Sequence, residues 1–262
     1  MNQWSRRRKR IVLTFVLLIL IFLIGLPTLF LFYRAPTCFD GKWNGNETGI
    51  DCGGSCELLC TAESLPLLLK GDPRLLRVND DTFELVAVVE NPNTNGEIYR
   101  AGYTFTIYSN SSSTPVRVVE GETYVPKAST FSIYEGPFTI DEGIVPSRVT
   151  FIWKEDSLIW QQGLLQTSKL TVNNPRLSGV DVRPRLEATV ENASLEDISN
   201  IELIALVENN SGTIFAASKT FIDRLPSGES MPVVFTWPAP FTDVALDTTI
   251  MIRILPDRSF VQ

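Results

Sequence analysis

The sequence contains no histidine. Histidine is the usual general base of hydrolases and a common zinc ligand. Its absence excludes Ser-His-Asp and Cys-His catalysis, HExxH zinc sites and histidine proton shuttles. Carboxylate pairs and lysine chemistry do not need histidine, but no motif for either occurs in the chain. The sequence therefore predicts a protein that is not an enzyme.

Positive charge is scarce beyond the first ten residues. Those ten residues carry five cations, so the net charge of −7 for the whole chain becomes −12 for residues 11–262. Binding of nucleic acid requires a basic footprint on the folded surface. We therefore expect no nucleic-acid partner.

Charge of either sign is absent from residues 11–33, IVLTFVLLILIFLIGLPTLFLFY. As a helix these 23 residues span roughly 34 Å, enough to cross the hydrocarbon core of a bilayer. Residues 6–10 read RRRKR, and cytoplasmic flanks carry the excess of Lys and Arg. The sequence predicts a cytoplasmic basic tail at 1–10, a transmembrane helix at 11–33 and an extracytoplasmic remainder. The location is then the cell membrane, and the lipid bilayer is the first partner.

A cleaved signal peptide is the alternative for the same stretch. Signal peptides have apolar cores of about 7–15 residues that end at a small-residue cleavage site. This apolar run is longer, and Tyr33-Arg34-Ala35-Pro36 does not fit such a site. The pattern favours an uncleaved anchor.

All cysteines fall in a Gly-rich neck, residues 35–62, with the spacing C-x13-C-x3-C-x3-C. The four are Cys38, Cys52, Cys56 and Cys60. In an oxidising compartment such a cluster predicts two disulfides, and four cysteines allow three pairings, which the sequence leaves open. A structural zinc site is the alternative, but it often uses C-x2-C pairs, which this stretch lacks.

The neck also contains a twelve-residue frame of oxygen ligands that suits calcium, from Asp40 to Asp51, with Gly45 at its sixth position. Lys42 stands at the third-position ligand slot, and an Asp replaces the bidentate Glu at the end. The alternative is that these polar side chains cap turns. The candidate ligands are Asp40, Asn44, Asn46 through its carbonyl, and Asp51.

The text CFDGKWNGNETGIDCGGSC resembles a small module of bacterial surface proteins, DGxxNGxETGxDCGGxC, over Asp40 to Cys56. It departs from that module at its end, where three residues instead of two separate Cys56 from Cys60. The resemblance implies a cell-surface setting and no activity.

From residue 63 onward the apolar residues recur with period two, which is typical of half-buried strands. We predict an all-β ectodomain of two tandem immunoglobulin- or fibronectin-like antiparallel β-sandwiches, at 63–156 and 157–262. Two repeated patterns suggest an internal duplication: VEN at 89–91 and 190–192, offset by 101, and V-x-F-x-W at 149–153 and 233–237, offset by 84. The second copy would then be 17 residues shorter between these landmarks.

Each sandwich is expected to have its own core, with a small interface between the two. Trp160, at the junction, is expected to pack the halves together. The first core is predicted to centre on Leu85, Val89, Phe105, Ile107, Phe151 and Trp153, and the second on Leu186, Val190, Leu203, Ala205, Phe235 and Trp237.

Two family resemblances support this fold. The text VVENPN at 88–93, followed by YTFTIY at 103–108, looks like the NPN-bearing sandwich of the late-embryogenesis-abundant group and water-stress (WHy) domains. The second half, with VEN at 190–192 and LPSGES at 225–230, is similar to the FxLYD-type bacterial sandwich but lacks its LYD text. These families imply seven-stranded sandwiches without catalytic residues.

Together these observations predict a non-enzymatic single-pass membrane protein that displays two sandwiches for protein binding or scaffolding at the cell envelope. The alternative is a carbohydrate- or cell-wall-binding module on a membrane-anchored stalk. That alternative requires an exposed aromatic platform, whereas the apolar context of Trp153, Trp160 and Trp237 predicts that they are buried.

Overall fold

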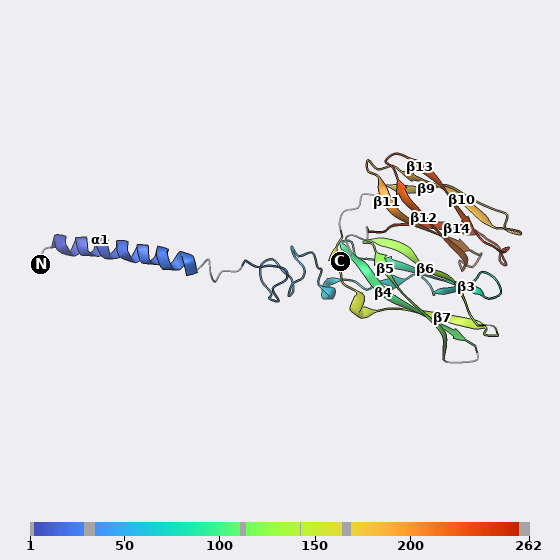
Figure 1. Cartoon of the computed structure of the whole chain (residues 1–262), viewed down its shortest axis with the longest axis horizontal. Coiled ribbons are helices and arrows are strands. Elements are labelled where there is room, and N and C mark those ends of the chain that lie inside the picture. The colour runs from blue at the N-terminus through green and yellow to red at the C-terminus, as the bar shows by residue number, and fades with distance from the viewer. Residues whose placement is uncertain (1–2, 29–34, 111–113, 142, 164–168, 257–262) are drawn as a thin grey trace. The chain divides into compact units, whose positions relative to one another are not determined.

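The computed structural model describes residues 3–28, 35–110, 114–141, 143–163 and 169–256. The chain divides into two compact units, 1–56 and 57–262, which are described separately. Their elements are labelled in Figure 1. The structure is mostly β, with one apolar N-terminal helix, several antiparallel sheets and disulfides, so the predicted all-β fold class is confirmed.

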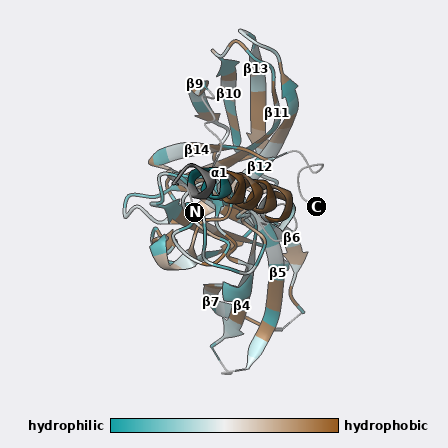
Figure 2. Cartoon of the chain, turned by 90° about the vertical axis from the view of Figure 1, so that its left-hand side faces the viewer, coloured by the Kyte–Doolittle hydropathy of each residue, from teal (hydrophilic) through white to brown (hydrophobic). Residues whose placement is uncertain are grey.

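The N-terminal helix α1 spans Gln3–Leu20 and continues through a π-helical turn, η1 (Ile21–Gly25), to Thr28. Residues Arg7–Thr28 are long and apolar enough to cross a membrane, and Figure 2 shows this helix coloured hydrophobic over most of its length. The hydroxyls of Thr14 and Thr28 donate to the carbonyls of Arg10 (2.7 Å) and Ile24 (2.8 Å). No hydroxyl on the described apolar stretch is therefore left unpaired, as a lipid environment demands. Residues 29–33 of the expected span lie outside the described residues.

The first half of the second unit contains two antiparallel sheets. One places β3 (Thr82–Asn91) between β6 (Ser129–Thr139) and the two short strands β1 (Leu68–Leu69) and β2 (Arg74–Arg77). The other places β4 (Gly96–Ser109) between β5 (Pro115–Val125) and β7 (Pro146–Trp153), and β8 (Gln161–Gln162) pairs with the start of β4. Two short 3-10 turns, η2 (Thr61–Glu63) and η3 (Glu155–Ser157), flank this half.

The second half repeats the arrangement. Strand β10 (Arg185–Asn192) lies between β9 (Leu170–Ser178) and β13 (Ser230–Thr236), and β11 (Ile198–Glu208) lies between β12 (Ile214–Leu225) and β14 (Asp247–Ile254). Strands β9, β10 and β13 thus match β2, β3 and β6, while β12, β11 and β14 match β5, β4 and β7. The two halves share one strand order.

This order corrects one of the two predicted repeat landmarks. The VEN pattern ends β3 and β10, which are equivalent strands. The V-x-F-x-W pattern falls on β7 and on β13, which occupy different places in their sheets. The offset of 84 is therefore wrong, and so is the shortening of the second copy by 17 residues. A V-x-F-x-W pattern suits any strand with one buried face, so two strands can share it without being equivalent in the fold.

Each half has its own buried core. The first contains the six expected residues, with Trp153 at its margin, and the second contains the six expected there. Trp160, which is 4% exposed, belongs to the first core, where Leu59 N–H donates to its carbonyl (3.0 Å) and its ring lies against Gly96. The expectation that Trp160 packs the two halves together is wrong, because the segment 160–163 pairs with β4.

A third apolar cluster joins the two halves. On β3, Leu85, Ala87 and Val89 face the first core, whereas the intervening Val86 and Val88 face this third cluster. The alternation on β11 is the same, and residues of both strands meet. The buried members are Leu76, Val86, Ile204, Leu206 and Ala217. The four sheets therefore pack as four layers, and the expectation of a small interface between the sandwiches is wrong.

A buried arginine strengthens the same interface. Arg253 on β14 is 8% exposed, and its guanidinium donates to Thr123 Oγ1 (2.7 Å) and to the Tyr124 carbonyl (2.9 Å) on β5. It also pairs with Glu202 and lies 5.0 Å from the Phe131 ring centroid. The planar fork of arginine satisfies several acceptors at once, so one side chain links three strands of both halves.

Candidate functional site

The neck is held by covalent bonds rather than by a core. Cys38 is bonded to Cys56, 18 residues along the chain. Cys52 and Cys60 are disulfide-bonded as well, and no cysteine of the described residues is free. The two predicted disulfides are confirmed, and the structure selects the pairing that the sequence left open. The thiolates that a zinc site would need are thus consumed.

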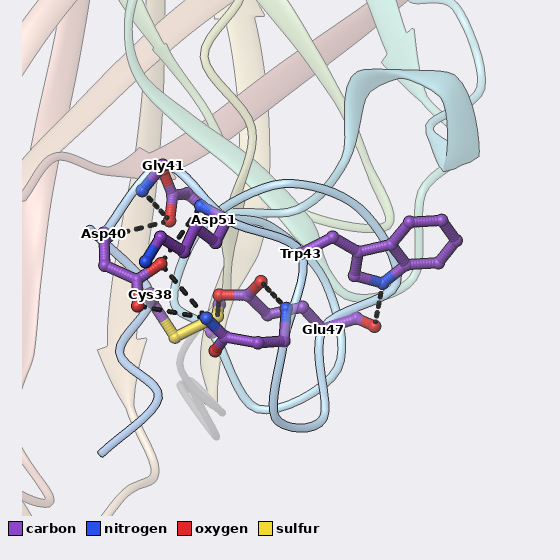
Figure 3. The surroundings of a disulfide bond; sticks show 9 residues. Cys38, Asp40, Gly41, Trp43, Glu47 and Asp51 are labelled. Carbon is purple, nitrogen blue, oxygen red and sulfur yellow. Dashed lines mark hydrogen bonds between the residues drawn. A yellow bond between two sulfur atoms is a disulfide. The ribbon is translucent and has the colours of Figure 1, made fainter. Parts of the chain in front are cut away.

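The carboxylates of the neck accept N–H groups from within the loop, as Figure 3 shows. Both oxygens of Asp51 accept from backbone N–H groups, those of Asp40 (3.0 Å) and Gly41 (2.9 Å). Asp40 in turn accepts from the Asn44 side-chain amide (3.0 Å) and the Lys42 N–H (3.0 Å). The hydrogen bond from Asn44 lowers the pKa of the Asp40 carboxyl.

The structure therefore brings three of the four candidate calcium ligands into one network. Asp40 and Asp51 cap turns there by accepting backbone N–H groups, the role that the alternative assigned to them. The Asn44 amide donates to Asp40, and among the described residues its buried Oδ1 has no hydrogen-bond partner. The Asn46 carbonyl lies against Gly54, where a Cβ would approach it to 1.6 Å. Calcium binding by this loop stays a prediction.

Sequence reasoning missed the exposed apolar side chains of the neck. Phe39, Trp43 and Ile50 are 77%, 70% and 63% exposed. The Trp43 indole Nε1–H donates to the Glu47 carbonyl at 2.9 Å, so its polar group is already paired within the loop. The missed signal was the occurrence of large apolar residues in a segment too short to bury them.

Two loops lie side by side at one end of the second half. Phe241 N–H donates to the Val180 carbonyl (2.9 Å), and the Asn209 amide donates to Asp243 Oδ2 (2.6 Å), which lowers the pKa of Asp243. Three apolar side chains protrude from these loops at exposures of 71%, 73% and 70%. We refer to Val182, Val244 and Leu246 as the loop-end patch. The last two line a hollow between the loops.

A cavity of about 280 Å³ opens where the two halves meet. Aromatic residues Phe215, Trp237 and Phe241 line one part of it, and Glu84 lines another. Burial raises the pKa of Glu84, and a hydrogen bond from the Tyr134 hydroxyl offsets part of this rise. Asp80, in the turn before β3, is the other carboxylate among the residues that line this cavity.

The three tryptophans of the second unit do not form an aromatic platform. Trp160 and Trp237 are 4% and 8% exposed, and the Trp237 indole donates to the Ala217 carbonyl at 2.8 Å. Trp153 packs edge-on against Phe151, with ring centroids 5.0 Å apart. These residues therefore do not supply the surface on which a sugar ring would stack.

No family model matches the chain, and no curated protein matches it. Among solved structures it is similar to a β-glucuronidase from Bacteroides uniformis at 15% identity and a TM-score of 0.22, covering 68% of this chain and 26% of that one. A second Bacteroides uniformis β-glucuronidase gives 16% identity and a TM-score of 0.19, with 68% and 26% covered. A β-glucuronidase from glycoside hydrolase family 2 gives 12% identity and a TM-score of 0.19, with 86% and 25% covered. The chain spans about a quarter of the length of these proteins, and no function follows from likeness at such scores.

Proposed function

We propose that this chain is a non-enzymatic single-pass membrane protein that displays a rigid pair of immunoglobulin-like sandwiches outside the membrane, for protein binding or scaffolding at the cell envelope. The observation that carries the proposal is the third apolar cluster, since Val86, Ile204 and Leu206 are at most 2% exposed between the two halves. Burial of this kind holds two modules in one orientation, which a scaffold requires.

Compartment and topology follow from the chain's first 62 residues. The helix Arg7–Thr28 is apolar enough to span a bilayer, and the basic tract directly before it favours a cytoplasmic N-terminus. Disulfides persist in oxidising compartments, which is consistent with an extracytoplasmic neck. Protease added to spheroplasts should digest residues 63–262 and spare the tail. Full protection of the ectodomain after the envelope is opened would contradict this topology.

The family resemblances belong to this proposal. The buried Asn91 opens the NPN text that resembles late-embryogenesis-abundant and WHy sandwiches, and Asn192 has the equivalent position in the FxLYD-like half. The neck resembles a module of bacterial surface proteins. All three imply structural or binding roles without catalysis, which agrees with the absence of histidine.

The loop-end patch is the surface that we assign to the partner. Val182, Val244 and Leu246 protrude from loops that hydrogen bonds hold in place, so little loop ordering is lost on binding. Exposed apolar residues beside a hollow are typical of protein contacts. The partner should present an apolar protrusion that enters the hollow between 179–184 and 241–248.

Position-specific cross-linking tests this assignment. A photoreactive amino acid at position 244 should form a discrete adduct with an envelope protein in intact cells, whereas the same group at Val118, 50% exposed on β5, should not. The triple variant V182S/V244S/L246S should abolish the adduct when the photoreactive group is moved to position 180. Equal adducts from positions 244 and 118 would show that the patch has no special role.

A further inference from the structure

The neck pairs its carboxylates within the loop and also exposes large apolar side chains. Its carboxylates at Asp40 and Asp51 accept N–H groups from within the loop, while Phe39, Trp43 and Ile50 are at least 63% exposed. Disulfides hold this arrangement, so the apolar residues cannot collapse into a core. A loop built this way is suited to contact with a surface less polar than water.

The tryptophan is prepared for that contact. Moving an indole out of water normally leaves its N–H without a partner, at a cost in free energy. The Trp43 Nε1–H already donates to the Glu47 carbonyl at 2.9 Å, and the Asn44 N–H donates to the Glu47 carboxylate at 3.1 Å. In Figure 3 the Trp43 ring points away from the network around Asp40 and Asp51. Burial of the ring therefore leaves no unpaired donor behind.

The chain fixes which surface lies within reach. The expected span ends at residue 33, and Phe39 is the sixth residue after it. Six extended residues cover at most about 20 Å, so the neck cannot leave the neighbourhood of the membrane that anchors the chain. Trp and other aromatic side chains concentrate at the headgroup level of membranes. The tether also raises the effective concentration of that surface, so weak contacts suffice.

We propose that the neck is an interfacial anchor, in which Phe39, Trp43 and Ile50 lie in the headgroup region of the outer face of the same bilayer that α1 crosses. The inference rests on the proposed membrane anchor. The segment 38–56 carries three carboxylates and one lysine, so the attraction comes from the apolar side chains and not from anionic lipids. Contact is therefore expected with zwitterionic lipid and at high salt.

Quenching of tryptophan fluorescence by brominated lipid tests the proposal on the full-length protein. The protein is reconstituted into nanodiscs of phosphatidylcholine with bromine on the upper acyl chain. A Trp4→Phe background removes the tryptophan near the other face. The emission of Trp43 is then the difference between this protein and the same protein with Trp43→Phe added. Brominated lipid should quench most of that emission, and the quenching should persist in high salt.

A matched control places the reporter elsewhere on the ectodomain. Leu195 is 96% exposed in the second half, and in the W4F/W43F background an L195W variant should show little quenching. Equal quenching at positions 43 and 195 would overturn the assignment of the contact to the neck. An unquenched Trp43 in protein that stays in the nanodiscs would overturn it as well.

The same experiment separates this inference from the proposed anchor. If the protein does not remain with the nanodiscs during flotation, the membrane anchor itself is wrong. If it floats and Trp43 is unquenched, only the interfacial contact is wrong. A F39S/I50S variant in the W4F background should reduce quenching of Trp43 without loss of flotation, because two of the three apolar contacts are removed.

Discussion

Asn91 and Asn192 have the same buried position in the two halves. The side-chain amide of Asn91 donates to the carbonyl of Pro126, between β5 and β6 (2.9 Å), and that of Asn192 donates to the carbonyl of Pro226, between β12 and β13 (3.1 Å). Each amide also donates to a carbonyl close to the next strand: that of Gly96, the first residue of β4 (2.8 Å), or that of Glu196, two residues before β11 (2.8 Å). Each side-chain oxygen accepts the N–H two residues on. Each asparagine thus links two connections that cross between the sheets of its sandwich: β3–β4 with β5–β6 in the first, and β10–β11 with β12–β13 in the second.

The first prediction is that Asn91→Ala and Asn192→Ala each destabilise the folded unit 57–262. The two residues are 1% and 0% exposed, so their partners would lose hydrogen bonds without gaining water. Each unsatisfied buried group costs about 1–3 kcal/mol. Chemical denaturation should show a loss of at least that size, whereas the exposed Asn210→Ala should change the unfolding free energy by less than about 0.5 kcal/mol. Similar losses at all three positions would contradict the clamp.

The VEN repeat and the pairing of strands show what sequence alone can predict here. Period-two alternation identified the strands and both cores, because one face of each strand is buried in its own half. The V-x-F-x-W match misled, since β7 and β13 share composition but not position. Buried asparagines were the better landmark, because an asparagine is retained in a strand only where its hydrogen bonds require it.

The sequence also carries a sign of the interface between the halves. Strand β3 reads LVAVV over 85–89 and β11 reads LIALV over 203–207, without polar residues in between. Strands buried on both faces give such continuous apolar runs. Alternation alone selects one face and leaves Val86, Ile204 and Leu206 unexplained. The contacts of Arg253 could not be predicted, because they join residues 129 and 130 positions apart.

The second prediction is that residues 57–262 unfold in one cooperative transition. Leu206→Ala removes buried surface from the shared cluster and should lower the unfolding free energy by about 2–5 kcal/mol while keeping a single transition. The fragment 157–262 would expose Ile204, Leu206 and Met251 to water, so it should self-associate. Calorimetry and analytical ultracentrifugation check the two points. Two separate transitions in the wild type, with a monomeric fragment, would restore the picture of independent modules.

The third prediction concerns pH. Burial raises the pKa of Glu84 above its ordinary value of 4.5, so the folded state binds more protons than the unfolded state between the two pKa values. Stability therefore falls as pH rises from about 4.5 through the folded pKa, and the penalty is complete above it.

The variant Glu84→Gln removes this titration. It should show a smaller fall in unfolding free energy over that range and should be more stable than the wild type at neutral pH, while its hydrogen bond with Tyr134 is retained as an amide contact. The same change at the exposed Glu229 serves as control. Parallel pH profiles for the wild type and E84Q, measured by urea denaturation, would show that Glu84 carries no such penalty.

The fourth prediction concerns the close approach within the neck. Gly54 has φ of +61°, and a Cβ there would lie 1.6 Å from the Asn46 carbonyl oxygen. Gly41 has φ of +70° and open space around it. Alanine at either position pays for the left-handed backbone, about 1–2 kcal/mol, but only at Gly54 must the backbone of the opposite turn also move. Gly54→Ala should therefore shift the disulfides away from the Cys38–Cys56 bond, as measured by peptide mapping of non-reduced protein, while Gly41→Ala should keep it. The opposite result is that Gly54→Ala and Gly41→Ala keep the same fraction of the Cys38–Cys56 bond. Since the neck has no apolar core, this would mean that the turn at 44–47 is easily displaced. The loop would then be too soft to hold Trp43 in a fixed orientation.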